Sequence, residues 1–308
     1  MGGRFYDSSS SFHRQNAPAQ GGAALPHHPF RPEETLRLHK ANGYDFVALT
    51  DHRNYNFKNF APETGLIVVP GMEMDRSIPG QPGIHCFHTV VLGREKDKGN
   101  PYEQDQRFES GAVSGQAEFQ TLLAESHRNG QITLYCHPEW SSTPAREFEK
   151  MRGNFAMEIW NSGCVLENGM DTNAAWWDEI LMQGQKLYGC ATDDGHSMDQ
   201  HCKGWVCVNA EKNVDSILEG LSTGAFYSST GPEIKDFYIE NGEATVVCSP
   251  CAEIVFRGGR FPCRREYDAE GKLTRATFRC PEGMQYLRVT VMDAQGRRAW
   301  TNPIFDFA

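Results

Sequence analysis

The chain has 308 residues, of which 39% are hydrophobic and 23% are charged, as in a soluble globular protein with one large and one small domain. Acidic residues outnumber basic ones by 40 to 30, and no basic stripe stands out, so we expect no nucleic-acid partner. No apolar stretch reaches the roughly 18 residues of a membrane span, so we also expect no membrane partner.

The cysteines indicate a cellular compartment. There are 10 of them, scattered along the chain and often inside apolar runs, which is typical of buried thiols in a reducing environment. Cys248 and Cys251 form a CxxC pair that would need Cys263 and Cys280 to complete a zinc site, and ordinary strand and loop cysteines are the simpler interpretation. The N-terminus has no apolar signal-peptide core, so we expect a cytoplasmic protein.

Residues 1–31 differ in composition from the rest of the chain. No acidic residue occurs between Ser8 and Pro32, and Ser, Gly, Ala, Pro and Gln dominate the segment. Such a composition has little apolar area to offset the entropy lost on ordering. We therefore expect an irregular or disordered N-terminal segment.

Residues 32–232 alternate between helix-like segments and apolar, strand-like runs. The first helix is expected at 32–43, with Pro32 in its first turn and Gly43 as its stop, and it leads into the apolar run 44–50. Later helices are expected at 116–130, 173–184 and 213–224. This alternation predicts a parallel α/β barrel.

Residues 233–308 show a different pattern. Short β-type runs follow one another, separated by Gly, Pro and Asn-Gly signals, and no helical period appears. Asn241-Gly242 is typical of a two-residue hairpin turn. The pattern predicts a small antiparallel β-sandwich domain.

Acidic and imidazole side chains recur where apolar runs end. A barrel whose strands repeatedly stop at metal ligands assembles a multinuclear site at one rim, so the pattern favours a metal-dependent hydrolase. The residues concerned are Asp51, His52, Glu73, His88, His137, Asp194 and His196.

The same segments resemble the PHP (polymerase and histidinol phosphatase) family of metallohydrolases. The segments that carry the resemblance are GYDFVALTDHR, VVPGMEMD, HTVVLG, YCHPEWS, AMEIWN and CATDDGH, with GAFYSSTGP and RAWTNPI pointing to a two-domain subgroup that has a small C-terminal β-domain. The resemblance implies a distorted (β/α)7 barrel. It also implies one to three divalent transition metals (Zn, Mn or Fe) at the C-terminal ends of the strands.

The resemblance assigns metal ligands residue by residue. Glu73 matches the carboxylate that bridges two metals, and His88 and His137 match the imidazoles that complete one of these positions. Asp194 matches the aspartate that completes the other position.

A separate metal and the catalytic groups follow from the same resemblance. His52 and His196 match ligands of this separate metal, and Asp51 stands where the family has either a ligand or a neighbouring carboxylate. Arg53 is the nearest candidate for an anion clamp. Asp51, His52, Arg53 and His196 are therefore the candidate catalytic residues.

One departure from the family pattern stands out. The family opens with a His-x-His strand shortly before the helix that begins at Pro32, but this chain has Gln20-Gly21-Gly22 there and no His-x-His anywhere. The metal position that depends on this pair keeps only two carboxylates, which hold a borderline-soft cation poorly. The imidazoles nearby are His13, His27 and His28. The position of His52 and His196 lacks a third ligand unless His27, His28 or Asp51 serves.

Three functions compete on this basis. The resemblance implies a phosphoesterase that acts on a small phosphorylated metabolite through a metal-activated hydroxide. Hydrolysis of a carboxylic or carbamate ester, or of an amide, is the second hypothesis. The third is a metal-binding protein with impaired catalysis, because the opening His-x-His is absent. The exact substrate and the oligomeric state stay open.

Overall fold

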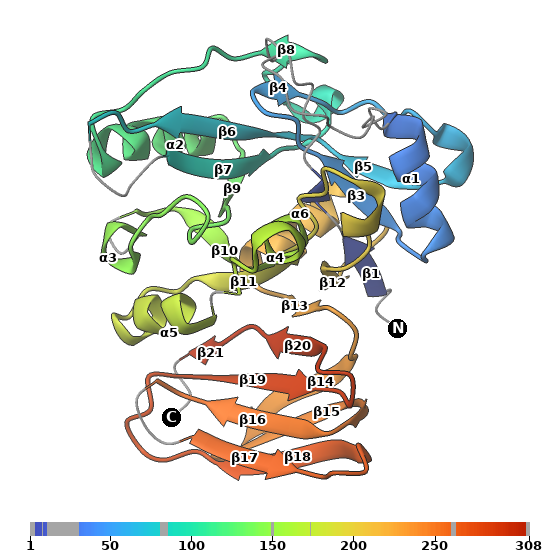
Figure 1. Cartoon of the computed structure of the whole chain (residues 1–308), viewed down its shortest axis with the longest axis vertical. Helices are drawn as coiled ribbons and strands as arrows, with labels where there is room; N and C mark the ends of the chain where they lie inside the picture. The colour runs from blue at the N-terminus through green and yellow to red at the C-terminus, as the bar shows by residue number, and fades with distance from the viewer. Residues whose placement is uncertain are drawn as a thin grey trace.

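The computed structural model describes residues 4–7, 9–10, 31–80, 86–148, 151–172, 174–259 and 263–305 (Figure 1). Helices and strands mix up to α6, and the rest of the described chain consists of strands (Figure 1). No helix among the described residues is long and apolar enough to cross a membrane.

Helices α1, α2, α5 and α6 form where the sequence predicts them, whereas α3 and α4 were not predicted. Their bounds are α1 Pro32–Ala41, α2 Gln116–Arg128, α3 Ala145–Phe148, α4 Ser162–Asn168, α5 Ala174–Met182 and α6 Val214–Thr223, with 3₁₀ turns η1 Pro62–Thr64, η2 Lys96–Lys98 and η3 Met198–Gln200. Helix α6 shows why: its buried Val214, Ile217 and Leu221 lie three and four residues apart on one face. Asn213 caps its N-terminus by accepting from the Ser216 backbone N–H, and left-handed Gly224 ends it.

The sheets of the first part are mixed rather than uniformly parallel. The parallel strands are β2 Ser9–Ser10, β3 Phe46–Leu49 and β5 Ile67–Val69 in one sheet, and β9 Ile132–Tyr135, β10 Asn154–Asn161 and β11 Tyr188–Thr192 in another. The antiparallel strands are β6 Gly71–Ser77 with β7 Cys86–Leu92, which also joins β9, and the short pair β4 Asn54–Tyr55 and β8 Gln106–Arg107.

The expected α/β class is confirmed in its general form. The described residues form a mixed α/β architecture with more strands than helices, and the distorted (β/α)7 barrel stays a prediction. The connection 78–85 between β6 and β7 is shorter than the dozen or so residues that a parallel crossover needs, so the two strands pair antiparallel.

Two short strands form among the N-terminal residues that the structure describes. Strand β1 (Arg4–Asp7) pairs antiparallel with β12 (Trp205–Asn209), and β2 pairs parallel with β3. Residues 1–3, 8 and 11–30 lie outside the described residues, so the irregular N-terminal segment stays a prediction. The strand beside β3 carries Ser9 and Ser10 rather than a histidine pair. Residues 20–22 and both His27 and His28 lie outside the described residues.

The C-terminal strands form two antiparallel layers, as the sequence predicts. One sheet joins β13 Phe226–Ser229, β16 Glu253–Arg257, β17 Cys263–Tyr267, β19 Tyr286–Met292, β20 Arg298–Thr301 and β21 Ile304–Phe305 to β12 and β1. The other contains β14 Ile234–Glu240, β15 Glu243–Cys251 and β18 Leu273–Arg279. Val246 of the second sheet and Phe256 and Val289 of the first share one buried core.

The hairpin prediction at Asn241-Gly242 is confirmed. Glu240 and Glu243 are paired across the turn, and Asn241 and Gly242 have φ angles of 50° and 72°. Two consecutive left-handed residues make the turn whose twist matches that of the flanking strands.

The larger sheet crosses the predicted domain boundary at residue 232. Strand β13, before the boundary, pairs with β12 on one side and with β20 on the other. The last strands of the chain are therefore hydrogen-bonded to strands of the first part. The division into 32–232 and 233–308 stays a prediction.

The four cysteines considered for a zinc site do not gather. Cys248 and Cys251 are buried with their sulfurs 3.7 Å apart, while Cys263 is exposed on β17. Among the residues that the structure describes, these cysteines form no group of three or more metal ligands.

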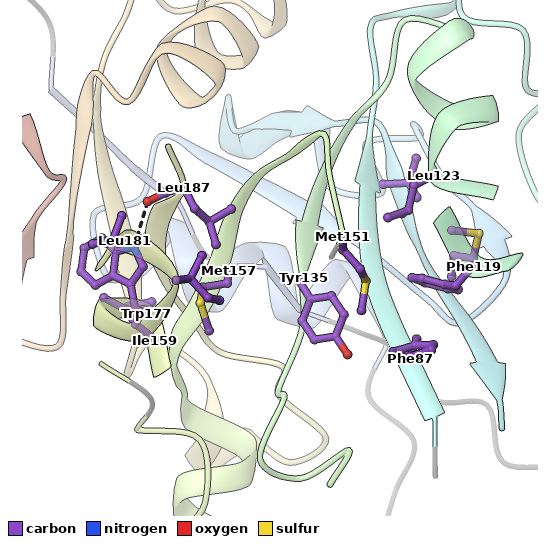
Figure 2. Packing of buried hydrophobic residues seen from close by; sticks show 14 of the residues in the cluster. Phe87, Phe119, Leu123, Tyr135, Met151, Met157, Ile159, Trp177, Leu181 and Leu187 are labelled. Carbon is purple, nitrogen blue, oxygen red and sulfur yellow. Dashed lines mark hydrogen bonds between the residues drawn. The ribbon is translucent and has the colours of Figure 1, made fainter. Parts of the chain in front are cut away.

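A rigid core supports the strands that carry the candidate site. Figure 2 shows Phe87 of β7, Tyr135 of β9 and Met157 of β10 in one buried cluster. Trp177 of α5 closes this cluster and donates its indole N–H to the Leu187 carbonyl at 2.8 Å (Figure 2). Burial of each such side chain contributes about 1.5–3 kcal/mol, which holds these strands in register.

Candidate metal centre

The segment after β3 is fastened to β6 by its backbone. The Arg53 N–H donates to the Glu73 carbonyl at 2.7 Å, and the Glu73 N–H donates to the Asp51 carbonyl at 3.2 Å. His52, between them, forms a parallel bridge with Glu73. Two segments that are about twenty residues apart in sequence thus place their side chains together.

Three imidazoles converge on the Glu73 carboxylate, which is only 2% exposed. Its Oε1 lies 2.6 Å from His88 Nδ1 and 3.2 Å from His137 Nε2, and its Oε2 lies 3.8 Å from His52 Nε2. The ligand atoms of His52, Glu73 and His88 all lie within 4.8 Å of one another. This donor set of imidazoles and one carboxylate fits a borderline divalent cation such as Zn²⁺.

Glu73 and His88 do not stand at the ends of strands, as the sequence pattern suggested. They lie within the β6–β7 hairpin, where His88 pairs across the strands with Asp75. Side chains two residues apart on a strand share a face, so Glu73 and Asp75 both point to the imidazoles. Asp75 was not among the predicted site residues, although the alternation Met-Glu-Met-Asp was a usable signal.

Asp75 connects two of the predicted catalytic residues. Its Oδ1 lies 3.1 Å from His52 Nδ1, which leaves His52 Nε2 directed to Glu73. A carboxylate behind an imidazole in this way fixes the ring orientation and raises its basicity as a ligand. The same carboxylate binds the Arg53 guanidinium. The predicted anion clamp is therefore already paired, and a substrate anion would have to compete with Asp75.

A second group of acidic residues lies behind His137. Glu73, Glu158 and Asp194 line a cavity of about 10 Å³, roughly the space of one water molecule. Glu158 Oε2 accepts from the His137 backbone N–H at 2.7 Å and from the Asn161 amide at 2.9 Å. The same Asn161 amide donates to Asp194 at 3.0 Å, so one side chain holds both carboxylates.

Glu158 was also not among the predicted site residues. It is the one charged residue in the run FAMEIW, and a carboxylate inside an otherwise buried strand is rarely there for packing. It supports His137, which follows β9 with a backbone φ of 22°.

The pKa values reflect this crowding. Burial by itself would raise the pKa of Glu73, but the charge on His52 and the hydrogen bonds with His137 and His88 outweigh it and hold this pKa well below its ordinary value. Burial opposes protonation of His137, yet its contact with Glu73 raises its pKa to about 10. Burial, offset in part by His137 and reinforced by Asp194, raises the pKa of Glu158 to about 7. The cluster thus holds more negative charge than Arg53 alone can balance.

Three of the predicted residues have backbones in the left-handed region. The φ angles are 54° at Arg53, 22° at His137 and 46° at Asp194. Such conformations are unfavourable for residues with a Cβ by about 1–3 kcal/mol and concentrate where a structure holds ligands in place. The strain is therefore consistent with a functional role for these three positions.

The remaining predicted residues lie at the margin of the centre. Asp51 is partly buried at the end of β3, and His196 has an exposed side chain on the loop after β11. The structure brings Asp194 to the cavity but does not place His196 in the compact group with His52. The assignment of His196 as a ligand stays a prediction.

Trp140 forms one wall beside the imidazoles. It is 44% exposed, and its indole lies 5.0 Å from the His137 ring and 5.7 Å from the His88 ring, measured between centroids. The backbone N–H of Trp140 donates to buried Asp171 at 2.9 Å, which fixes this loop. A large aromatic surface therefore borders the centre on its solvent side.

Comparison with known proteins yields only distant structural similarity. No family model and no curated protein matches the chain. It is similar to PsfC from Pseudomonas syringae, with 11% identity, 69% of this chain and 85% of that chain covered, and a TM-score of 0.42. It is also similar to an amidohydrolase from Chromobacterium violaceum, a structure with bound sulfate and no metal. The two chains are 14% identical, the match covers 62% of this chain and 88% of that chain, and the TM-score is 0.41.

A third structure is similar to the same degree. It is a protein from Bifidobacterium adolescentis, provisionally assigned as a metal-dependent phosphoesterase, with 11% identity, 54% of this chain and 82% of that chain covered, and a TM-score of 0.37. At TM-scores below 0.5 these similarities carry no weight in assigning a function. The functional argument rests on the residues of the centre itself.

Proposed function

We propose that the protein is a metal-dependent hydrolase that holds a divalent transition metal through Glu73, His88 and His137. The observation that carries this proposal is the convergence of two imidazole nitrogens on one buried carboxylate oxygen, at 2.6 and 3.2 Å. The atoms that now contact one another are those that would coordinate the cation. Because a metal binds imidazole through a nitrogen lone pair, a cation would take the place of the hydrogen bonds between these two rings and Glu73.

The ligand types suggest which metals the centre takes. Imidazole with carboxylate suits Zn, Mn or Fe. The neighbouring cavity between Glu73, Glu158 and Asp194 offers mainly oxygen ligands, so a further cation there would be a harder one, such as Mn²⁺. Glu158 thus adds a third carboxylate to Glu73 and Asp194, which compensates in part for the ligands of the absent His-x-His. We propose one metal at the imidazole position and up to two more.

The residues around the metal have separable roles in hydrolysis. A bound divalent cation lowers the pKa of a water molecule toward neutrality and polarises the scissile bond of a substrate. Asp75 holds His52 with its Nε2 toward Glu73, and Trp140 shields one side of the centre from solvent. Arg53, one third exposed, supplies positive charge at the rim.

The substrate class that we propose first is a small phosphorylated molecule, which agrees with the resemblance of the sequence segments to PHP phosphoesterases. One observation favours a second class. Because Asp75 already pairs with Arg53, little positive charge is left for a phosphoryl group with two charges. A carboxylic or carbamate ester, or an amide, develops a single negative charge during hydrolysis, so less positive charge is needed to stabilise it.

The test combines metal content with a substrate screen. Protein reconstituted with Zn²⁺, Mn²⁺ or Fe²⁺ is assayed by elemental analysis and with p-nitrophenyl phosphate, bis-p-nitrophenyl phosphate and p-nitrophenyl acetate. A phosphoesterase hydrolyses the phosphate esters, and an esterase hydrolyses the acetate. Metal binding without any turnover would show a protein with impaired catalysis. No bound metal after reconstitution would refute the proposal.

A matched control guards against contaminating enzymes. The His137→Ala variant, purified in parallel, should lose both metal at this position and hydrolysis. His127→Ala is the comparison, because His127 is a partly buried histidine that contacts Thr133, on the face of the sheet remote from Glu73. It should keep its activity.

A further inference from the structure

A second group of metal-ligand side chains lies apart from the proposed hydrolytic centre. His39 of α1, Asp193 after β11 and Cys202 after η3 place one ligand atom each within 4.8 Å of the others. The side chains of His39 and Asp193 are fully buried, and Cys202 is partly exposed. None of the three takes part in the contacts around Glu73.

The imidazole of His39 has a defined orientation. Its Nδ1 lies 2.8 Å from the Thr35 carbonyl, one turn earlier in α1. A carbonyl oxygen only accepts, so Nδ1 carries a proton, and Nε2 is the nitrogen that faces Asp193. Ligating histidines commonly donate their other ring N–H to a backbone carbonyl in this way. On a neutral ring, Nε2 presents a lone pair to a carboxylate oxygen.

Two acceptors that face each other need a positive charge between them. Either a second proton on His39 or a cation can provide it. The separation of His39 Nε2 and Asp193 Oδ2 is 3.4 Å. A charge-assisted hydrogen bond is shorter, at about 2.7–2.9 Å. Two ligands bound to tetrahedral zinc at about 2.0–2.1 Å lie about 3.3 Å apart, which matches the observed distance.

The protein scaffold holds Asp193 and Cys202 in place without using their ligand capacity fully. Asp193 accepts from the backbone N–H groups of Cys202, Lys203 and Gly204 at 2.6, 2.9 and 2.9 Å. Cys202 has a φ of 60°, a conformation that favours glycine, and so is strained. Its partial exposure gives a cation a path to the group. The ring of His201 is also close, 5.3 Å from that of His39 between centroids.

We propose that His39, Asp193 and Cys202 bind a structural zinc ion, which ties helix α1 to the loop 193–204. Imidazole, carboxylate and thiolate are ligands that zinc prefers, and the full burial of His39 and Asp193 leaves no room for a substrate, which makes the ion structural. The loop begins beside Asp194, which lines the cavity of the hydrolytic centre. The zinc would therefore keep Asp194 in position.

Cobalt substitution tests the proposal directly. Metal-free full-length protein is titrated with Co²⁺, and the near-ultraviolet absorption band that only a thiolate–cobalt bond produces is recorded. We expect one equivalent of this band, lost in Cys202→Ser. Two controls should retain it: Cys263→Ser, an exposed thiol on β17, and Cys136→Ser, the thiol that lines the hydrolytic cavity. A band that is absent in the wild type, or lost only in Cys136→Ser, overturns the proposal.

Zinc content and thermal stability give an independent readout. We expect the His137→Ala variant to retain one tightly bound zinc, and Cys202→Ser to retain one fewer zinc than the wild type. Removal of zinc by a chelator should lower the Tm of His137→Ala clearly and leave that of the double variant with Cys202→Ser unchanged. If the chelator lowers both Tm values equally, His39 and Asp193 form only an ion pair. Neither result depends on hydrolytic activity.

Discussion

The buried cluster around Asp178 and the buried cluster around Glu73 are built differently. In the first, Asp178 of α5 receives two hydrogen bonds from the Arg288 guanidinium, at 2.8 and 2.7 Å, and one from the Tyr286 hydroxyl at 3.1 Å. Arg257 adds a further ion pair at 2.6 Å. Arg288 is 1% exposed and stacks on Trp177, with 4.8 Å between the guanidinium carbon and the ring centroid.

In the candidate metal centre, carboxylates outnumber the permanently cationic side chains, the reverse of the Asp178 cluster. Its buried or partly buried carboxylates belong to Glu73, Asp75, Glu158 and Asp194, and Arg53 is the permanent cation that contacts one of them. The other positive charges depend on protonated imidazoles. Buried carboxylates gathered in this way are unfavourable unless a cation compensates them.

The difference teaches how to tell a structural cluster from a functional one. The Asp178 cluster satisfies its charge and its hydrogen bonds with protein groups and joins α5 to β16 and β19. In the cluster around Glu73, a permanent cation, Arg53, contacts only Asp75 among the described carboxylates, and the backbones at Arg53 and His137 are strained. The first should therefore matter for stability, and the second for metal binding and activity.

The largest effect is expected for His137→Ala. Loss of this ligand should reduce hydrolysis by at least about 1000-fold, which corresponds to about 4 kcal/mol of barrier. The fold should persist, because His137 follows a strand and the core beneath it is unchanged. Steady-state kinetics and circular dichroism measure the two outcomes. Activity within about threefold of the wild type would remove His137 from the centre.

Asp178→Ala should lower the stability of the fold and leave metal binding unchanged, the reverse of His137→Ala. It leaves the buried Arg288 guanidinium without its carboxylate, so the free energy of unfolding should fall by about 3–5 kcal/mol. Metal content per folded chain should not change. Chemical denaturation and elemental analysis of the folded fraction provide the measurement. A stability loss below about 1 kcal/mol would contradict a structural role for this cluster.

Asp75→Asn should weaken the metal centre without destabilising the fold. The amide keeps the shape of the side chain but loses the charge that orients His52, and such changes reduce metal affinity by about 10–100-fold. Competition with a chromophoric chelator gives the affinity. Asp199→Asn, at an exposed carboxylate on η3, is the matched control and should bind metal as the wild type does. Equal affinities in both variants would exclude Asp75 from the centre.

The smallest effect is expected for Arg257→Ala, at the edge of the structural cluster. Arg257 is 45% exposed, and ion pairs near the surface contribute about 0–1 kcal/mol. Because Asp178 keeps its hydrogen bonds with Arg288 and Tyr286, the free energy of unfolding should change little. A loss as large as that of Asp178→Ala would show that the surface arginine, rather than the buried one, stabilises the junction.

Part of the site could be predicted because its residue types follow local strand patterns. Glu73, His88 and His137 each stand in or directly after an apolar run, and the structure brings them together around one oxygen. Asp75 and Glu158 were missed, because a carboxylate in a strand shows its role only when its partners are known. Likewise, His39 has the pattern of an ordinary helix residue until Asp193 and Cys202 are placed beside it.

The sequence by itself determined the local elements. The helical spacing of Val214, Ile217 and Leu221 and the Asn241-Gly242 turn depend on neighbours along the chain, so the pattern was sufficient. Only the tertiary structure decided how the strands pair: β6 antiparallel to β7, and β13 with β20. Strand pairing joins segments far apart in the sequence, and hydrophobic periodicity specifies that a strand exists but not which partner it takes. The same long-range pairing decides which carboxylates meet which imidazoles.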